Sequence, residues 1–408
     1  MTTKMKNKWF SFALILFAST AHARHFTEIE FEGLEATKQA TLMDLLPRAL
    51  PAEISDDELR EFSRRVKNLG LFDQVMTSEE GSKIKVVLKH KSTLSPIVSF
   101  SSGKTLEDSS ATFGLVDYDG FGRATRVGAK IAYAERGINF AAWIDEHTYS
   151  PNSWAQEIEV YRTSSGFRFQ DSSTSWSRNR LGGFLEWVTP FKYGSRVIYE
   201  IQPAVYYENF SNTNGQSPRD GYYFGSLFEV IYDAYKWDDL APHGYKAVLE
   251  LRPGYFTDGS FRGETRGKFS AAHAFSDRTA FTMFLNSNIV NSGNVNHSIL
   301  IGSQQGVRGL PDSLYRCSFV NYGNFELRHS IGIAPRLFLQ PTLFADAAVF
   351  QPMNSGGSAE PWVQALSTGA GLRIVPTGLT QLLARLDLAK LHIPNDAWMV
   401  QFGITQYF

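Results

Sequence analysis

The 408-residue sequence is poor in three things: cysteine, net charge and long apolar runs. Its single cysteine, Cys317, excludes an internal disulfide framework and a multi-cysteine zinc site. The 40 lysines and arginines nearly balance 41 aspartates and glutamates, and the resulting net charge of −1 argues against a nucleic-acid partner, which needs a clustered basic surface. After the N-terminal segment there is no run of about 18 apolar residues, which excludes a helical inner-membrane protein.

Sequence motifs for common catalytic sites are also missing. There is no Gly-x-Ser-x-Gly elbow, no complete phosphate-binding loop ending in Gly-Lys-Ser/Thr, and no dinucleotide-binding fingerprint. The nine histidines are scattered without the close spacing of metal ligands. We therefore expect no enzyme activity, no cofactor and no metal site.

The N-terminus predicts export from the cytoplasm. Three lysines precede the apolar run 9–18, and Ala21-His22-Ala23 supplies the small residues that a signal peptidase requires. The run is too short to span a bilayer. We expect a signal peptide over 1–23, cleaved after Ala23; a buried helix at the start of a soluble domain is the alternative.

Residues 24–92 are predicted to form a small α+β domain. The expected order is a strand, two helices and two strands, over residues 26–31, 42–46, 55–70, 72–80 and 83–89. The second helix has the clearest signature, because Ser55 and Glu58 form a capping box and Gly70 ends it. This order, with the entry GLFDQV at 70–75, resembles a polypeptide-transport-associated (POTRA) domain. An unrelated α+β domain is the alternative on this segment alone.

Residues 93–408 are predicted to form β-strands throughout. Side chains alternate between apolar and polar with period two, as where Tyr199 and Ile201 alternate with Glu200 and Gln202. Aromatic residues make up 14% of the chain, yet its mean hydropathy is only −0.22. That combination is typical of strands with one face toward lipid and the other toward a wet lumen.

About sixteen alternating segments can be counted. They lie near 95–102, 110–118, 123–134, 138–147, 153–164, 176–190, 194–209, 221–235, 244–256, 261–275, 279–291, 318–331, 336–350, 362–375, 380–391 and 397–408. Short turns alternate with long loops at 164–178, 209–221, 291–318 and 351–361. This pattern predicts an all-β transmembrane barrel of antiparallel strands, with the POTRA-like domain on the periplasmic side. A soluble β-sandwich is the alternative, but it seldom runs so long without a domain break.

The 28-residue loop 291–318 is too long for a hairpin connection and carries Arg308 between the turn glycines Gly306 and Gly309. From Arg308 to Phe319 the chain can extend about 36 Å at ~3.3 Å per residue, more than the roughly 25 Å apolar height of such barrels. The arginine can therefore reach down into the lumen. We expect an inward lid loop; a solvated charge on an outer loop is the alternative.

An arginine confined in the lumen needs carboxylate partners. Strand phase places Asp346 on the inward face of segment 336–350, opposite Leu343, and it places Glu326 on the inward face of segment 318–331. Three more charged residues share the inward phase and are interpreted as a salt-bridged lining without a specific ligand: Arg373, Arg385 and Asp387. The glycines of Gly369-Ala370-Gly371 are assigned to strand curvature or to clearance for the lid.

The loop 291–318 resembles the lid loop of a known family, the BamA/TamA superfamily of outer-membrane assembly and translocation barrels, also called bacterial surface antigens. The lid signature Val-Arg-Gly-Tyr/Phe of that family is matched by Val307-Arg308-Gly309, with Leu310 in place of the aromatic residue. Family members hold the lid arginine with acidic residues of the barrel wall. The resemblance implies that Asp346 is the first partner of Arg308 and that Glu326 is the second.

Other motifs agree with this resemblance. Phe344 and Asp346 match the family motif Phe-x-Asp-x-Gly, with Ala348 where glycine is usual, and Asp119-Gly120-Phe121-Gly122 is similar to an early periplasmic turn. The resemblance also implies a signal for barrel insertion in the last strand, at Phe402, Ile404 and Phe408.

The barrel should close between its first strand, 94–102, and its last, 397–408. Pro96 and several serines make the first strand a poor partner in a ladder, so we expect a seam that can open sideways. An opened edge could capture a client strand by β-augmentation, and strand 72–80 could do the same. The residues expected to mark the seam are Ile97, Ser99, Val400 and Thr405, with Ser99 and Thr405 close enough for a cysteine pair.

These inferences predict an outer-membrane insertase or translocase that handles unfolded client polypeptides without nucleotide or covalent chemistry. The expected partners are the lipid bilayer, unfolded outer-membrane or secreted clients, and periplasmic chaperones or accessory proteins, with no nucleic acid. Two alternatives stay open: a secretion pore for one dedicated protein, and a lipid-handling or structural barrel.

Overall fold

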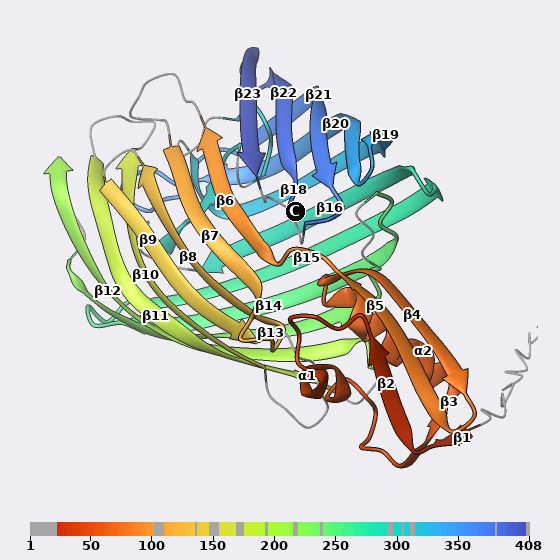
Figure 1. Cartoon of the computed structure of the whole chain (residues 1–408). Coiled ribbons are helices and arrows are strands. Elements are labelled where there is room, and N and C mark those ends of the chain that lie inside the picture. The colour runs from red at the N-terminus through yellow and green to blue at the C-terminus, as the bar shows by residue number, and fades with distance from the viewer. Residues whose placement is uncertain are drawn as a thin grey trace, which may run out of the picture.

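The structure, a computed structural model, describes most of the chain beyond the predicted signal peptide. The described residues are 23–101, 110–134, 137–146, 155–168, 175–191, 195–214, 219–236, 240–291, 297–303, 306–310, 315–379 and 382–404. The predicted signal peptide lies outside them apart from Ala23. In Figure 1 a small N-terminal domain, coloured red to orange, lies against one end of a β-barrel.

The N-terminal domain has helices packed on strands. Its elements are β1 (Ala23–Phe26), β2 (Glu28–Glu32), α1 (Gln39–Met43), β3 (Ala52–Ser55), α2 (Asp56–Asn68), β4 (Phe72–Glu80) and β5 (Lys83–His90). Strands β2, β5 and β4 form one sheet in that order, with β2 parallel to β5 and β4 antiparallel to it. The predicted order of a POTRA-like domain is present as β2, α1, α2, β4 and β5. The pair β1–β3 was not predicted, and α1 begins and ends three residues before the expected 42–46.

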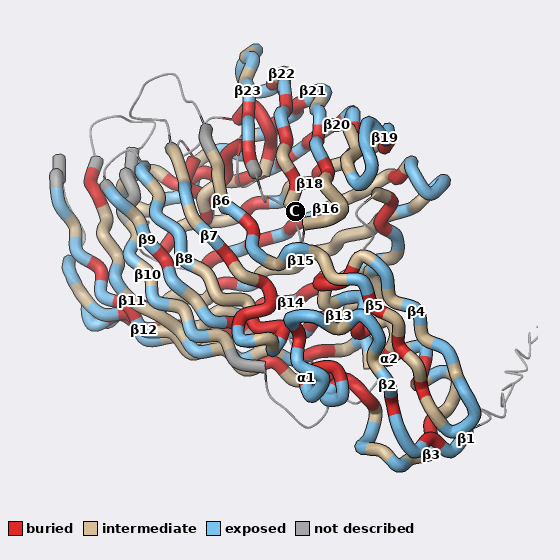
Figure 2. The backbone as a smooth tube through the Cα atoms, in the orientation of Figure 1, coloured by how far each residue is buried: buried red, intermediate tan, exposed pale blue. Residues whose placement is uncertain are grey.

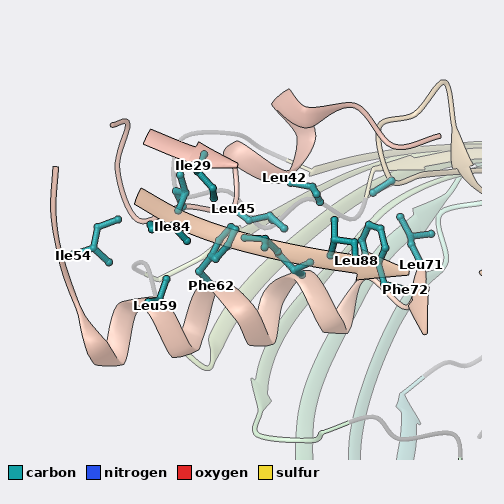
Figure 3. Close-up of a cluster of buried hydrophobic side chains, with 14 of the residues drawn as sticks. Ile29, Leu42, Leu45, Ile54, Leu59, Phe62, Leu71, Phe72, Ile84 and Leu88 are labelled. Carbon is teal, nitrogen blue, oxygen red and sulfur yellow. The ribbon is translucent and has the colours of Figure 1, made fainter. Parts of the chain in front are cut away.

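Helix α2 begins at the predicted capping box and closes the core of this domain (Figure 3). The backbone N–H of Glu58 donates to Ser55 Oγ (3.3 Å), and the backbone N–H of Ser55 donates to Glu58 Oε2 (2.9 Å). Leu59 and Phe62 of the helix are buried in one cluster with Ile84 of β5. Burial of each such side chain stabilises the domain by about 1.5–3 kcal/mol.

Sixteen antiparallel strands form a closed barrel, which confirms the predicted fold class. They are β6 (Leu94–Ser101), β7 (Ser110–Gly120), β8 (Thr125–Ala134), β9 (Gly137–Glu146), β10 (Ala155–Arg168), β11 (Ser175–Pro190), β12 (Val197–Asn214), β13 (Gly221–Asp233), β14 (Gly244–Phe256), β15 (Phe261–Ser276), β16 (Thr279–Asn291), β18 (Tyr315–His329), β20 (Leu337–Pro352), β21 (Val363–Pro376), β22 (Ala384–Ile393) and β23 (Ala397–Ile404). Two short strands, β17 (Ile299–Ile301) and β19 (Ile331–Ala334), add to β18 and β20. Strands β10 to β12 extend into the long loops expected at 164–178 and 209–221.

Alternation along each strand sorts side chains to the two faces of the wall. On β20, for example, Leu343 is 63% exposed on the outer face, whereas Asp346 is fully buried inside. Figure 2 shows the same alternation of exposed and buried residues along many barrel strands. Closure pairs the backbone polar groups between strands, as a chain in lipid requires. Within the described residues, no helix is long and apolar enough to cross a membrane.

Across the seam between the first and last barrel strands, the described residues form a ladder of four pairs. Strand β6 pairs with β7 from Leu94 through Ser101, but with β23 only from Val98 through Ser101 among the described residues. Ser99 lies opposite Gly403, so the expected pairing of Ser99 with Thr405 is wrong by two residues.

The remaining predicted residues of the seam and of the insertion signal lie as follows. Ile97 of β6 is partly buried and packs at the edge of the N-terminal core. Val400 and Phe402 of β23 point outward and are exposed. Ile404 is the last residue of β23, while Thr405 and Phe408 lie outside the described residues.

Candidate functional site

The loop between β16 and β18 turns back into the barrel. Strand β17 first extends the hairpin by pairing with the start of β18, from Tyr315 to Cys317. The chain then folds inward, and Val307, Arg308 and Leu310 are all buried. We call residues 306–310 the lid. The sequence did not reveal β17, and β18 begins three residues before the expected start.

Apolar side chains hold both sides of the lid. Val307 and Leu310 are fully buried in a cluster that includes Ile301 of β17, Phe350 of β20 and Leu391 of β22. Leucine at position 310 therefore packs against the barrel wall where the family motif has an aromatic residue. The backbone N–H of Leu310 donates to the carbonyl of Val307 (3.1 Å) and closes a tight turn around the arginine.

Arg308 makes an extensive set of polar contacts. Its Nε and Nη2 donate to Asp346 Oδ2 and Oδ1 at 2.8 and 2.6 Å, and its Nη1 donates to Glu326 Oε1 at 2.7 Å. The backbone N–H of Arg308 adds a bond to Asp346 Oδ2 (3.0 Å). Its guanidinium carbon lies 3.5 Å from the ring centroid of Phe344. The fork to Asp346 is bidentate, and the face of the ring adds a cation–π contact.

Glu326 serves more than the lid. It also accepts hydrogen bonds from Arg328 Nε (2.7 Å) and Arg373 Nη2 (2.8 Å). Arg373, which the sequence placed in a general lining, is therefore a direct part of this site. One carboxylate from β18 thus binds arginines from the lid, from its own strand and from β21.

Asp387 of β22 is the third acidic residue near the lid arginine. It is fully buried, with Oδ2 3.6 Å from Arg308 Nη1 and 4.0 Å from Arg385 Nε. Neither of its oxygens accepts a hydrogen bond from any described residue. A Cβ added at Gly371 would lie only 2.1 Å from Asp387 Oδ1, so this glycine leaves the space that the carboxylate occupies. We call Arg308, Asp346, Glu326, Arg373 and Asp387 the lid lock.

The lid lock holds a loop by charge, through one lid arginine and carboxylates of the barrel wall. In the part of the chain that the structure describes, no three His, Cys, Asp or Glu side chains are grouped to hold a metal ion. What the arrangement can do is fix the lid in the lumen through contacts that polar groups or water could replace. Buried ion pairs of this kind depend on both partners, because removal of one leaves the other unpaired.

Fold and site together define a β-barrel with an arginine-locked internal lid. No protein-family model matches the sequence, and no curated protein matches it. Solved structures do: CdiB from Acinetobacter baumannii is 13% identical, with a TM-score of 0.61 over 94% of this chain and 74% of its own. BamA from Haemophilus ducreyi lacking POTRA domains 1–3 is 13% identical, with a TM-score of 0.57 over 93% and 83%. CdiB from Escherichia coli is 10% identical, with a TM-score of 0.56 over 95% and 91%.

These identities are low, so the likeness shows the fold alone. The chain has the barrel fold of BamA and CdiB, and the resemblance expected from the sequence is confirmed at that level.

Proposed function

We propose that this chain is an outer-membrane insertase or translocase for unfolded polypeptides. In this proposal a signal peptide over 1–23 directs export, residues 24–92 lie in the periplasm, and residues 93–408 span the outer membrane. Large apolar side chains on consecutive strands supply the lipid-facing surface, among them Phe113, Ile131, Phe140, Val160 and Leu185.

The lid lock is the observation that carries the proposal. A rigid pore or a purely structural barrel does not need a loop tip held in its lumen by an arginine and carboxylates from separate strands. Ionic contacts hold firmly in a closed lumen and can be exchanged for water or for polar groups of a passing chain. The lock therefore suits a plug that must be displaced and then return.

The seam between β6 and β23 supplies the second element of the mechanism. If β6 and β23 part, each exposes unpaired backbone groups at membrane depth, where an unsatisfied group costs several kcal/mol. A client strand could pair with such an edge and remove that cost, which is β-augmentation. The chemistry needed is backbone hydrogen bonding alone.

A secretion pore for one dedicated protein is the second candidate. It shares the lid, because cargo that passes through the lumen must displace Arg308 from Asp346 and Glu326. It differs at the seam, because passage along the barrel axis leaves β6 and β23 paired. The seam therefore distinguishes the two functions.

A cysteine pair in place of Ser99 and Gly403, in a Cys317→Ser background, provides the test because these two residues are directly opposed. Residues Ala389 and Met399, opposed across β22 and β23, provide the matched control pair. Each pair would be expressed in cells that lack the native protein, and outer-membrane and secreted proteins would be quantified. An insertase should lose specific membrane barrels only when the seam is cross-linked, and a secretion pore should keep exporting its partner. Normal insertion through a cross-linked seam would overturn lateral opening.

A further inference from the structure

The N-terminal domain contacts the turn between β7 and β8 through hydrogen bonds that are largely shielded from solvent. The backbone N–H of Lys38 and the hydroxyl of Thr41 both donate to the carbonyl of Gly122, at 2.8 and 3.1 Å. The hydroxyl of Thr37 donates to Asp119 Oδ2 at 2.7 Å, and both of these residues are buried. The motif at 119–122 that the sequence singled out is therefore a docking point for the segment that leads into α1.

Apolar packing and close backbone approach reinforce this first contact. Val116, Tyr118 and Ala124 belong to the same buried cluster as the core of the N-terminal domain. Gly122 has a φ of 69°, and a Cβ there would lie 2.6 Å from the carbonyl oxygen of Ala36. Only glycine fits this approach without strain.

A second contact joins the domain to turns on the other side of the seam. Asp73 Oδ2, at the start of β4, accepts a hydrogen bond from Nη2 of Arg336 (3.1 Å), which lies between β19 and β20. The backbone N–H of Ser92 donates to the carbonyl of Gly378 (3.1 Å), and Ser92 forms an isolated bridge with Leu379, between β21 and β22. The ion pair is partly exposed, with the arginine side chain 45% accessible.

The order of strands around the barrel places these two contacts on opposite sides of the seam. The wall runs β20, β21, β22, β23, β6, β7 and β8, and the seam lies between β23 and β6. The first contact is with the turn between β7 and β8, on the β6 side of the seam. The second is with the turns before β20 and before β22, on the β23 side. Figure 1 shows the domain beside the end of the barrel at which β6 begins.

We propose that the N-terminal domain is a clamp across the base of the seam. The contact at 119–122 is the fixed arm, because it combines buried hydrogen bonds with a shared apolar core. The contact through Asp73 and Ser92 is the releasable arm, because it consists of a partly exposed ion pair, one backbone hydrogen bond and an isolated bridge. When the seam parts, the releasable arm leaves Arg336 and Gly378, and the domain moves with β7 and β8. This inference rests on the lateral opening proposed above.

The first test releases the arm and measures the seam. Arg336→Gln in the full-length protein removes the ion pair, and hydrogen exchange of the amides of 98–101 and 401–404 then reports seam opening. Exchange should become about two- to fivefold faster, the range expected for loss of one exposed ion pair. Lys83→Gln is the control, because it removes exposed ion pairs to Glu28 (3.2 Å) and Glu30 (3.1 Å) that lie within the N-terminal domain and away from the seam. Unchanged seam exchange in Arg336→Gln, or an equal change in the control, would overturn the clamp.

The second test locks the releasable arm. Cysteines in place of Ser92 and Leu379, in the Cys317→Ser background, can be bridged because the two residues are paired. Oxidation should slow seam exchange at least twofold and should block client insertion as cross-linking of Ser99 to Gly403 does. If the seam disulfide blocks insertion and the arm disulfide does not, the clamp is wrong and the proposed function stands. If neither disulfide blocks insertion, lateral opening is wrong. The exchange rates of the seam amides then decide by themselves whether the N-terminal domain is a clamp.

Discussion

Replacement of the lid arginine tests the lid lock most directly. Arg308→Ala removes the bidentate contact with Asp346 and the contact with Glu326. Breaking a buried ion pair by removal of one partner costs about 3–5 kcal/mol. Glu326 keeps Arg328 and Arg373, so the unpaired charge falls mainly on Asp346, and we expect the lower end of that range. A loss of about 3 kcal/mol lowers the ratio of docked to undocked lid by about 150-fold.

Hydrogen exchange of the lid amides measures this ratio in the full-length protein. The backbone N–H groups of Val307, Gly309 and Leu310 donate to Gly302 O, Ser303 Oγ and Val307 O, so all three are protected while the lid is docked. Arg308→Ala should speed their exchange by about two orders of magnitude, in proportion to the population that undocks. Arg308→Lys keeps the charge but loses the planar fork, and we expect an intermediate increase.

Amides in the centre of β14, far from the lid, provide an internal reference because barrel strands should keep their protection. Exchange of the lid amides at the wild-type rate in Arg308→Ala would refute the reasoning. It would mean that the apolar cluster around Leu310 holds the lid without the arginine. Faster exchange in both the lid and β14 would instead indicate general destabilisation of the barrel.

Three further changes probe the lock and the N-terminal domain. Glu326→Gln should lower the thermal unfolding temperature more than Arg308→Ala does, because three arginines lose a shared carboxylate. Gly371→Ala should displace Asp387, cost about 1–3 kcal/mol and speed lid exchange, whereas Gly267→Ala, with nothing within 4 Å of its Cβ, should not. Burial lowers the pKa of His90 below its usual value. The unfolded chain therefore binds a proton at this histidine more readily than the folded domain does, and protonation destabilises the fold. Protection of β5 amides should therefore fall as the pH drops below about 6.5, and His90→Phe should remove that dependence.

The sequence predicted the barrel well because a period-two pattern is read residue by residue. Each strand of such a wall must present alternate side chains to lipid and lumen, so the order of apolar and polar residues records both the strand and its phase. The same phase placed Asp346 and Glu326 inward, where both contact Arg308. The two short strands β1 and β3 were missed because four residues carry too little pattern to be distinguished from a loop.

The register between β6 and β23 could not be predicted from the period-two pattern. A period-two repeat fixes which face a residue occupies but does not fix its offset along the partner strand. Ser99 was assigned to Thr405 and pairs with Gly403, a shift of two residues that preserves the face. Hairpin turns set the register elsewhere, but β6 and β23 are the first and last barrel strands in the sequence and have no turn between them. The hydrogen bond from Arg373 to Glu326 was also not predicted. It joins β21 to β18 across the intervening β20, and strand phase gives the face of a side chain but not how far that side chain extends along the wall.

The lid lock and the clamp act on different parts of the barrel. The carboxylates that face Arg308 come from β18, β20 and β22, all on the same side of the seam. Release of Arg308 from these carboxylates therefore breaks no described ion pair across β23 and β6. The contacts at Gly122 and Arg336 do join the two sides, through the N-terminal domain. In the proposed mechanism, passage through the barrel and opening of its wall are therefore controlled separately, so a substitution in the lid lock should leave the seam paired, and one in the clamp should leave the lid docked.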